Sequence, residues 1–266
     1  MPFSVFDPRD VIAIHDAAID YAVNVQRASF QKTEQEKSSL VATSALSALS
    51  HEMVCLHRAI KDLSLSGWAF AAPILLRSIL DAMCSIAVIA NSDRPDVAAF
   101  KYFYAFTKDF LHDPTRAPDS VAGMEAPIRA ELEASIIQHM AQMTEGDQQA
   151  ASNFKEQPPA GYYWYSDLFR GPTEIIKRFF GADMLHTYRY LSSATHAAFI
   201  GMRLFRDDPG LQDINPRKDP GAAGFAIIGS SRMLTESSRV IALFRGLGDL
   251  GYDAVLKVMR DCRRLM

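Results

Sequence analysis

The chain has 266 residues, of which 48% are hydrophobic, 22% charged and 10% aromatic, and its formal net charge is -3. This is the composition of an ordinary soluble globular protein, and it excludes an intrinsically disordered chain, a collagen, a coiled coil and a small disulfide scaffold. A chain of this length buries enough surface to fold without disulfides or a structural metal.

The first part of the chain shows helical periodicity almost throughout. Asp7-Pro8 combines an N-cap residue with a proline at the first helical position, and predicts a helix from there to about residue 31. Thr33-Glu34-Gln35-Glu36 has the spacing of a capping box and predicts a second helix, ending near residue 65. The third helix, about 68–90, is apolar nearly all round, so we expect it at the centre of a bundle. Pro95 begins a fourth, aromatic-rich helix.

The rest of the chain continues as helices separated by breaks rich in proline and glycine. We expect a loop at 112–123, and a long loop at 207–221, where three prolines and two glycines occur. No segment shows the alternation of a strand. The predicted fold class is therefore all-α, a bundle of about eight helices forming one domain over 1–266, whose later helices are expected at about 125–153, 173–180, 183–206, 222–246 and 252–264.

Charge and cysteine content exclude several kinds of partner. Residues 1–160 hold 13 basic and 20 acidic side chains, net -7, and residues 161–266 hold 15 and 11, net +4. This difference falls far short of a basic nucleic-acid-binding domain, although the second part could present a local anion-binding surface. The three cysteines are odd in number and lack metal-ligand spacing. We expect Cys55 and Cys84 to act as small core residues, and no disulfide-linked partner.

Two segments bear on targeting. The N-terminus lacks a basic region followed by an apolar run, so no signal peptide is predicted. The apolar stretch 68–90 is long enough to cross a bilayer. Arg77 and Asp81 lie at its centre, however, and each would cost ~2.5–3.5 kcal/mol there. A buried helix, a cytoplasmic location and no membrane partner are expected.

Arg77 and Asp81 are the first candidate site residues. Their spacing of four places both side chains on one face of the central helix. Two charges within an apolar helix must be paired or hydrogen-bonded, because an unpaired buried ion costs several kcal/mol. The pair is therefore interpreted either as part of a polar site between helices or as a structural ion pair that fixes helix register.

A polar stripe is the second candidate. Arg189, Ser193 and His196 share one face of the predicted 183–206 helix, while Tyr188 and Leu191 belong to its apolar side. A histidine beside an arginine can perform acid–base catalysis while the guanidinium neutralises a phosphate. The alternative is a solvated helix face.

A metal or cofactor site is not expected. His51, Glu52, Cys55 and His57 lie close together in the sequence, but the repeated Glu-x-x-His pattern of a di-metal bundle is absent. The chain also lacks a glycine-rich phosphate loop and a G-x-S-x-G nucleophile elbow.

Two segments together resemble a known family. The apolar segment 73–81 is similar to a helix in which an arginine, here Arg77, is followed four residues later by an acid. Residues 164–180 and then 188–196, with a tyrosine, a Leu-Ser pair and a histidine in order, look like a second signature. In this order they resemble the bacterial helical family called domain of unknown function 5677. Asp81 departs from the pattern, because the acid is usually a glutamate.

The resemblance covers about residues 45–205 and implies an architecture like that of the HEPN (higher eukaryotes and prokaryotes nucleotide-binding) superfamily. Its ribonucleases carry an arginine, four to six residues and then a histidine, duplicated across a dimer interface, and cut RNA without metal. Arg189 and His196, separated by six residues, satisfy this pattern. The resemblance thus implies a homodimer with RNA as a possible partner, catalytic Arg189 and His196, and as supporting polar residues Ser192, Ser193, Tyr188, Arg77 and Asp81.

The leading hypothesis is a HEPN-like metal-independent ribonuclease or RNA-binding protein. The alternative is a non-catalytic helical interaction or scaffold protein, in which the Arg77–Asp81 and Arg189–His196 groups are structural. The two differ in where these side chains should lie. A catalytic pair should line an open cleft, whereas a structural pair should be buried and fully hydrogen-bonded.

Overall fold

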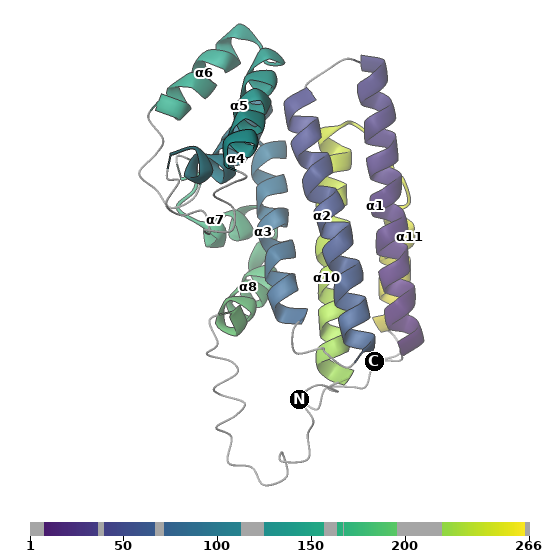
Figure 1. Ribbon diagram of the computed structural model, residues 1–266. Helices are drawn as coiled ribbons and strands as arrows, with labels where there is room; N and C mark the ends of the chain where they lie inside the picture. The colour runs from purple at the N-terminus through teal and green to yellow at the C-terminus, as the bar shows by residue number, and fades with distance from the viewer. Residues whose placement is uncertain are drawn as a thin grey trace.

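The structure is a computed structural model that describes residues 8–36, 40–66, 72–112, 125–156, 164–166, 168–195 and 220–263. These residues form helices and turns, and no strand occurs among them (Figure 1). The all-α prediction is confirmed. The helices are α1 (Pro8–Glu36), α2 (Leu40–Leu65), α3 (Ala72–Ala90), α4 (Pro95–His112), α5 (Glu125–Ala141), α6 (Glu145–Glu156), α7 (Pro172–Phe179), α8 (Gly181–Thr195), α10 (Pro220–Phe244) and α11 (Tyr252–Arg263).

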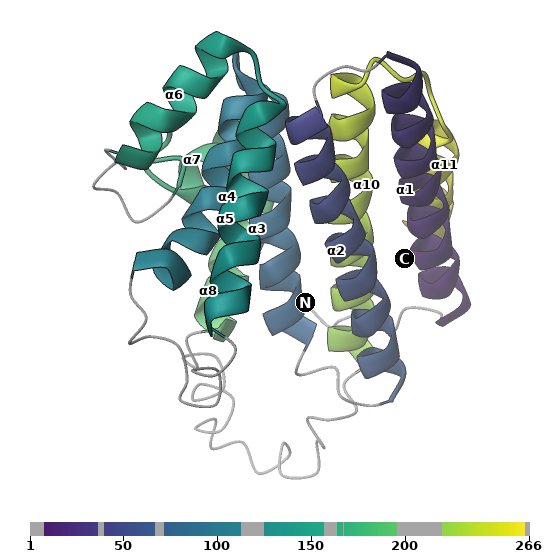
Figure 2. The ribbon, with the colours of Figure 1, turned by 45° about the horizontal axis from the view of Figure 1, so that its top comes forward.

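The apolar helix α3 lies at the centre, as its all-round hydrophobicity predicts. It packs against α2 and α10 on one side and against α4, α7 and α8 on the other (Figures 1 and 2). Helix α10, late in the chain, also contacts α1 and α2 and so completes a bundle with α1, α2 and α3. The core of this bundle includes fully buried Leu76, Ile79 and Met83 of α3.

The predicted boundary between the first two helices is wrong. Helix α1 continues to Glu36, and the Thr33 hydroxyl donates to the carbonyl of Ser29 within α1. The start of α2 is capped from elsewhere, because Asp96 Oδ1 of α4 accepts a hydrogen bond from the amide of Ala42 at 2.9 Å. Thr33 instead accepts from the buried side chain of Arg245, just after α10.

The described residues hold ten helices, not about eight, in part because the expected 125–153 helix is two helices. Thr144 separates α5 from α6 and caps α6: its hydroxyl accepts from the amide of Asp147 and donates to the Asp147 carboxylate. This Thr-x-x-Asp spacing is a local N-cap signal. The predicted helix 183–206 is described only as far as residue 195, and the predicted loop 207–221 lies outside the described residues except at the start of α10.

Two further predictions concern the cysteines and the membrane. Cys84 is buried in the core, as expected, but Cys55 is exposed on α2, so the prediction for Cys55 is wrong. In the part of the chain that the structure describes, no helix is both long and apolar enough to cross a bilayer.

Candidate functional site between α3 and α8

The α3 half of the candidate site is the Arg77–Asp81 pair. Arg77 Nε donates to Asp81 Oδ2 at 3.1 Å, across one turn of the helix. The Arg77 side chain is 18% exposed, whereas that of Asp81 is 51% exposed. The guanidinium therefore lies mostly inside the protein, and its carboxylate partner lies at the edge.

Helix α8 contributes Tyr188, which covers the same guanidinium. The central carbon of the Arg77 guanidinium lies 4.3 Å from the centroid of the Tyr188 ring, a cation–π contact. Arg77 Nη2 also donates to the Tyr188 hydroxyl at 3.4 Å. The two sequence segments on which the family resemblance depends, 111 residues apart at these positions, thus meet in one contact.

The electrostatics of the pair follow from this unequal burial. Desolvation raises the pKa of Asp81, and the Arg77 guanidinium opposes that shift. Burial works against the charge of Arg77, but the hydrogen bond to Tyr188 and the charge of Asp81 outweigh it and raise the pKa of Arg77. Arg77 Nη1 is buried and has no hydrogen-bond partner among the described residues.

The exposure of Asp81 lowers the expected cost of Asp81→Ala. Removing one partner of a fully buried ion pair reduces the free energy of unfolding by ~3–5 kcal/mol. Because Asp81 is half-exposed and Arg77 keeps its contact with Tyr188, we expect a loss of only about 0–1 kcal/mol. Arg77→Ala should cost more, since it also removes buried aliphatic packing. Urea unfolding of both variants tests this, and a loss above about 3 kcal/mol for Asp81→Ala would contradict it.

The remaining predicted site residues lie on or beyond α8. Arg189 is exposed, next to half-buried Tyr188. Ser192 and Ser193 lie on the last described turns of α8, one turn beyond Tyr188 and Arg189, but their side chains are outside what the structure describes. His196 lies outside the described residues. The structure thus brings together Arg77, Asp81 and Tyr188.

The residues considered as metal ligands are divided between two faces of α2. His51, Glu52 and Cys55 are exposed, and Cys55 Sγ lies 3.6 Å from His51 Nε2. His57 is fully buried on the opposite side. No cluster of three or more potential metal ligands occurs among the described residues.

Sequence reasoning missed a second polar cluster, in the core between α1, α2 and α10. His15 of α1 and His57 of α2 are 1% and 0% exposed, and their rings stack with centroids 4.2 Å apart. His57 Nδ1 lies 2.7 Å from the Ser230 hydroxyl of α10. Because Ser230 donates its own hydrogen to the carbonyl of Ile227, Nδ1 of His57 is the donor in this contact.

The buried pair favours neutral imidazoles. Desolvation lowers the pKa of His57 to about 3, and the neighbouring His15 adds to this effect. Burial also lowers the pKa of His15, although its hydrogen bond to the exposed Asp16, at 2.8 Å, opposes the shift. A sequence signal for this burial existed, because His57 lies four residues after buried Met53 and three before buried Ile60. His57 is fully buried between His15 and Ser230, so we interpret its contacts as part of the core packing.

Comparison of the chain with known protein families, with curated proteins and with solved structures gave no match. The family resemblance of the two segments therefore stays a prediction.

Proposed function

We propose that the chain is a HEPN-like protein that binds RNA at the α3–α8 site and cleaves it without a metal ion. The observation that carries the proposal is the contact between Arg77 and Tyr188, which joins the two segments of the resemblance. A shared site would explain why the two segments meet, and Arg189 lies on the exposed side of α8.

In this proposal the residues have separate roles. Arg77 is a positioning residue, held by Asp81 and Tyr188 beside the site. His196 acts as a general acid or base, on the ribose 2′-hydroxyl that attacks phosphorus or on the oxygen that leaves. Arg189 stabilises the charge that develops on the phosphoryl oxygens. A homodimer would bring two copies of the Arg189–His196 motif together.

The alternative, a non-catalytic interaction protein, is favoured by one specific observation. Arg77 already has two partners within the chain, Asp81 and Tyr188, as expected of a structural group. The two functions differ in what His196 does, because a structural histidine has no activity to lose. A test of cleavage therefore separates them.

The test is cleavage of single-stranded RNA by the purified chain in excess EDTA. We expect cleavage, and a rate reduced roughly 10²–10⁴-fold in His196→Ala, the usual contribution of one general acid or base. The control is His186→Ala, which removes an exposed histidine of α8 and should cut at the wild-type rate and melt at the same temperature. Absence of cleavage would favour the scaffold alternative, and cleavage retained in His196→Ala would remove His196 from the mechanism.

RNA could also be bound without being cut. In that case Arg189→Ala should weaken binding and flatten its salt dependence, because one phosphate contact and its released counterion are lost. Fluorescence anisotropy with a labelled oligonucleotide at several salt concentrations measures both quantities. Unchanged affinity in Arg189→Ala would show that α8 does not contact the phosphates.

The composite site also predicts a homodimer whose interface includes α8 and the segment that follows it. Light scattering at tens of micromolar should give twice the mass of the 29.5 kDa chain. A monomer at that concentration would carry only one copy of the Arg189–His196 motif and would contradict the proposed composite site.

A further inference from the structure

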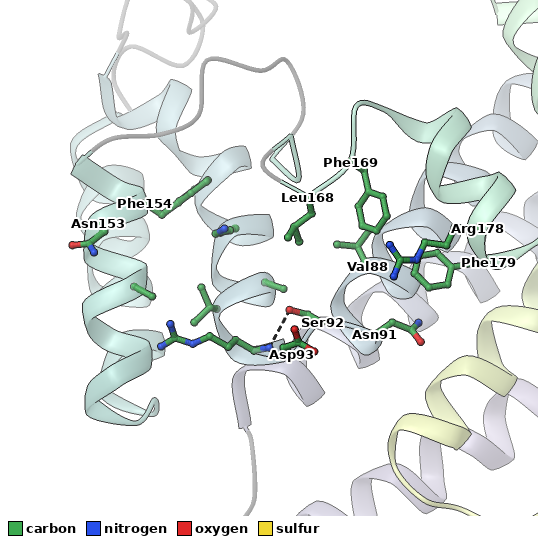
Figure 3. A pocket seen from close by; sticks show the side chains of 15 residues that line it. Val88, Asn91, Ser92, Asp93, Asn153, Phe154, Leu168, Phe169, Arg178 and Phe179 are labelled. Atoms are coloured by element: carbon green, nitrogen blue, oxygen red, sulfur yellow. Dashed lines mark hydrogen bonds between the residues drawn. The ribbon is translucent and has the colours of Figure 1, made fainter.

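A cleft of about 840 Å³ lies away from the α3–α8 site, at the other end of α3. One wall is formed by α4 and α6, and the other by the C-terminal end of α3 and by α7 (Figure 3). Leu168, from the turn before α7, extends between the two walls and is 50% exposed. The volume falls within the range of small-molecule sites in proteins.

About half of the surface of the cleft is apolar. Val88 and Val97 are buried beneath it, Phe154 lies on one wall, and Leu168 and Phe169 lie above. Leu168 is a large aliphatic side chain left half in water, which costs free energy unless a ligand covers it. An apolar ligand body would bury this side chain.

The charge of the cleft is positive. Arg94, Lys101 and Arg178 line it, and Asp93 is its one carboxylate among the described lining residues. Arg94 is used within the fold, since its Nε donates to Asp147 of α6 at 2.7 Å. Arg178 and Lys101 also line the cleft, and Lys101 Nζ lies 5.1 Å from the centroid of the Phe154 ring.

Arg178 is the better placed of these two cations. Its guanidinium carbon lies 5.6 Å from the ring centroid of Phe169 and 5.7 Å from that of Phe179. It is exposed, and the structure shows no ion pair between it and a described residue. Two aromatic rings thus hold a planar guanidinium at the cleft, a geometry suited to a carboxylate that accepts two parallel hydrogen bonds.

We propose that this cleft binds a small monocarboxylate with an apolar aryl or alkyl body. The carboxylate would pair with Arg178, and the body would cover Leu168 and the apolar wall beside Phe154. A single negative charge fits better than two, because Arg94 is paired with Asp147 and the remaining lining charges, Arg178, Lys101 and Asp93, sum to +1. Asn91 and Asn153, both exposed at the walls, can hydrogen-bond to a polar edge of the body.

Calorimetric titration of the full chain with naphthoate and with its neutral analogue naphthamide tests the proposal. We expect naphthoate to bind with a dissociation constant below about 1 mM, and naphthamide to bind about tenfold more weakly, because only the anion pairs with Arg178. Arg178→Gln should reduce naphthoate affinity about tenfold and leave naphthamide affinity unchanged. Equal binding of the two probes, or no binding of naphthoate at 1 mM, would overturn the proposal.

Two further variants distinguish a specific ion pair with Arg178 from diffuse attraction by the positive surface. Lys177→Gln removes a neighbouring exposed cation of α7 that does not line the cleft, and should leave naphthoate affinity unchanged. Leu168→Ala removes apolar surface that the ligand body would cover, and should weaken the binding of both probes alike. Naphthoate affinity reduced alike by Lys177→Gln and Arg178→Gln would indicate diffuse charge attraction and overturn the site. Each variant's melting temperature, within about two degrees of wild type, verifies folding.

Discussion

His57→Gln is expected to flatten the dependence of stability on pH below neutrality. Burial lowers the pKa of folded His57 to about 3, whereas an unfolded chain binds a proton at about 6.5. The contribution of His57 to the free energy of unfolding is therefore fully present well above pH 6.5. It falls as the pH drops toward 3, because only the unfolded state gains the proton. Between pH 7.5 and 5 this single group should remove about 2 kcal/mol from the free energy of unfolding of the wild type.

The measurement is urea unfolding of the wild type and of His57→Gln at both pH values. Glutamine can still donate to Ser230 but does not titrate, so His57→Gln should show a smaller loss between the two pH values. The carboxylates that titrate below pH 5 are common to both proteins and cancel in the comparison. His51→Gln, at an exposed position on the same helix, should keep the wild-type slope.

His15 should add to the same effect, because burial lowers its pKa as well. The double variant with His15→Gln and His57→Gln is expected to show the flattest dependence of the three proteins. Equal slopes in the wild type and His57→Gln would mean that water reaches the stacked pair and that the two imidazoles are not sealed between α1, α2 and α10.

The central place of α3 could be predicted because a helix that is apolar on every side has no face suited to water. The boundary near residue 33 could not, because the cap of α2 is Asp96, 54 residues away from Ala42 in the chain. Thr33-Glu36 has capping-box spacing, but tertiary contacts decide where a helix ends. Thr144 is a different case, because its cap is local in sequence, yet the prediction of one helix over 125–153 passed over it.

The site was predictable only in part. The helical spacing of Arg77 and Asp81 put both on one face, and the structure shows the ion pair. Their unequal exposure depends on how α8 lies against α3, which no local pattern encodes. The stacking of His15 on His57 likewise depends on the relative register of α1 and α2, so the sequence around His57 suggested only a possible metal ligand and gave no sign of this contact.

Leu76→Ala is expected to lower the free energy of unfolding by about 2–5 kcal/mol, the usual cost of a cavity in a core that does not collapse. Leu76 is fully buried in α3 and faces α10 at Gly229, where a methyl group added to the glycine would lie 3.8 Å from Leu76 Cδ2. Ile74→Ala, on the same helix but 56% exposed, should change stability by no more than about 0.5 kcal/mol.

Gly229→Ala sharpens this prediction, because 3.8 Å is ordinary van der Waals contact and the new methyl group needs no displacement of Leu76. Alone it should be neutral or stabilise the protein by up to about 1 kcal/mol, through higher helix propensity. Combined with Leu76→Ala it should recover part of the loss, because the methyl group lies at the edge of the cavity, so the two effects should not add. Strict additivity in urea unfolding, or a loss below about 1 kcal/mol for Leu76→Ala, would show that α3 and α10 do not pack through these two positions.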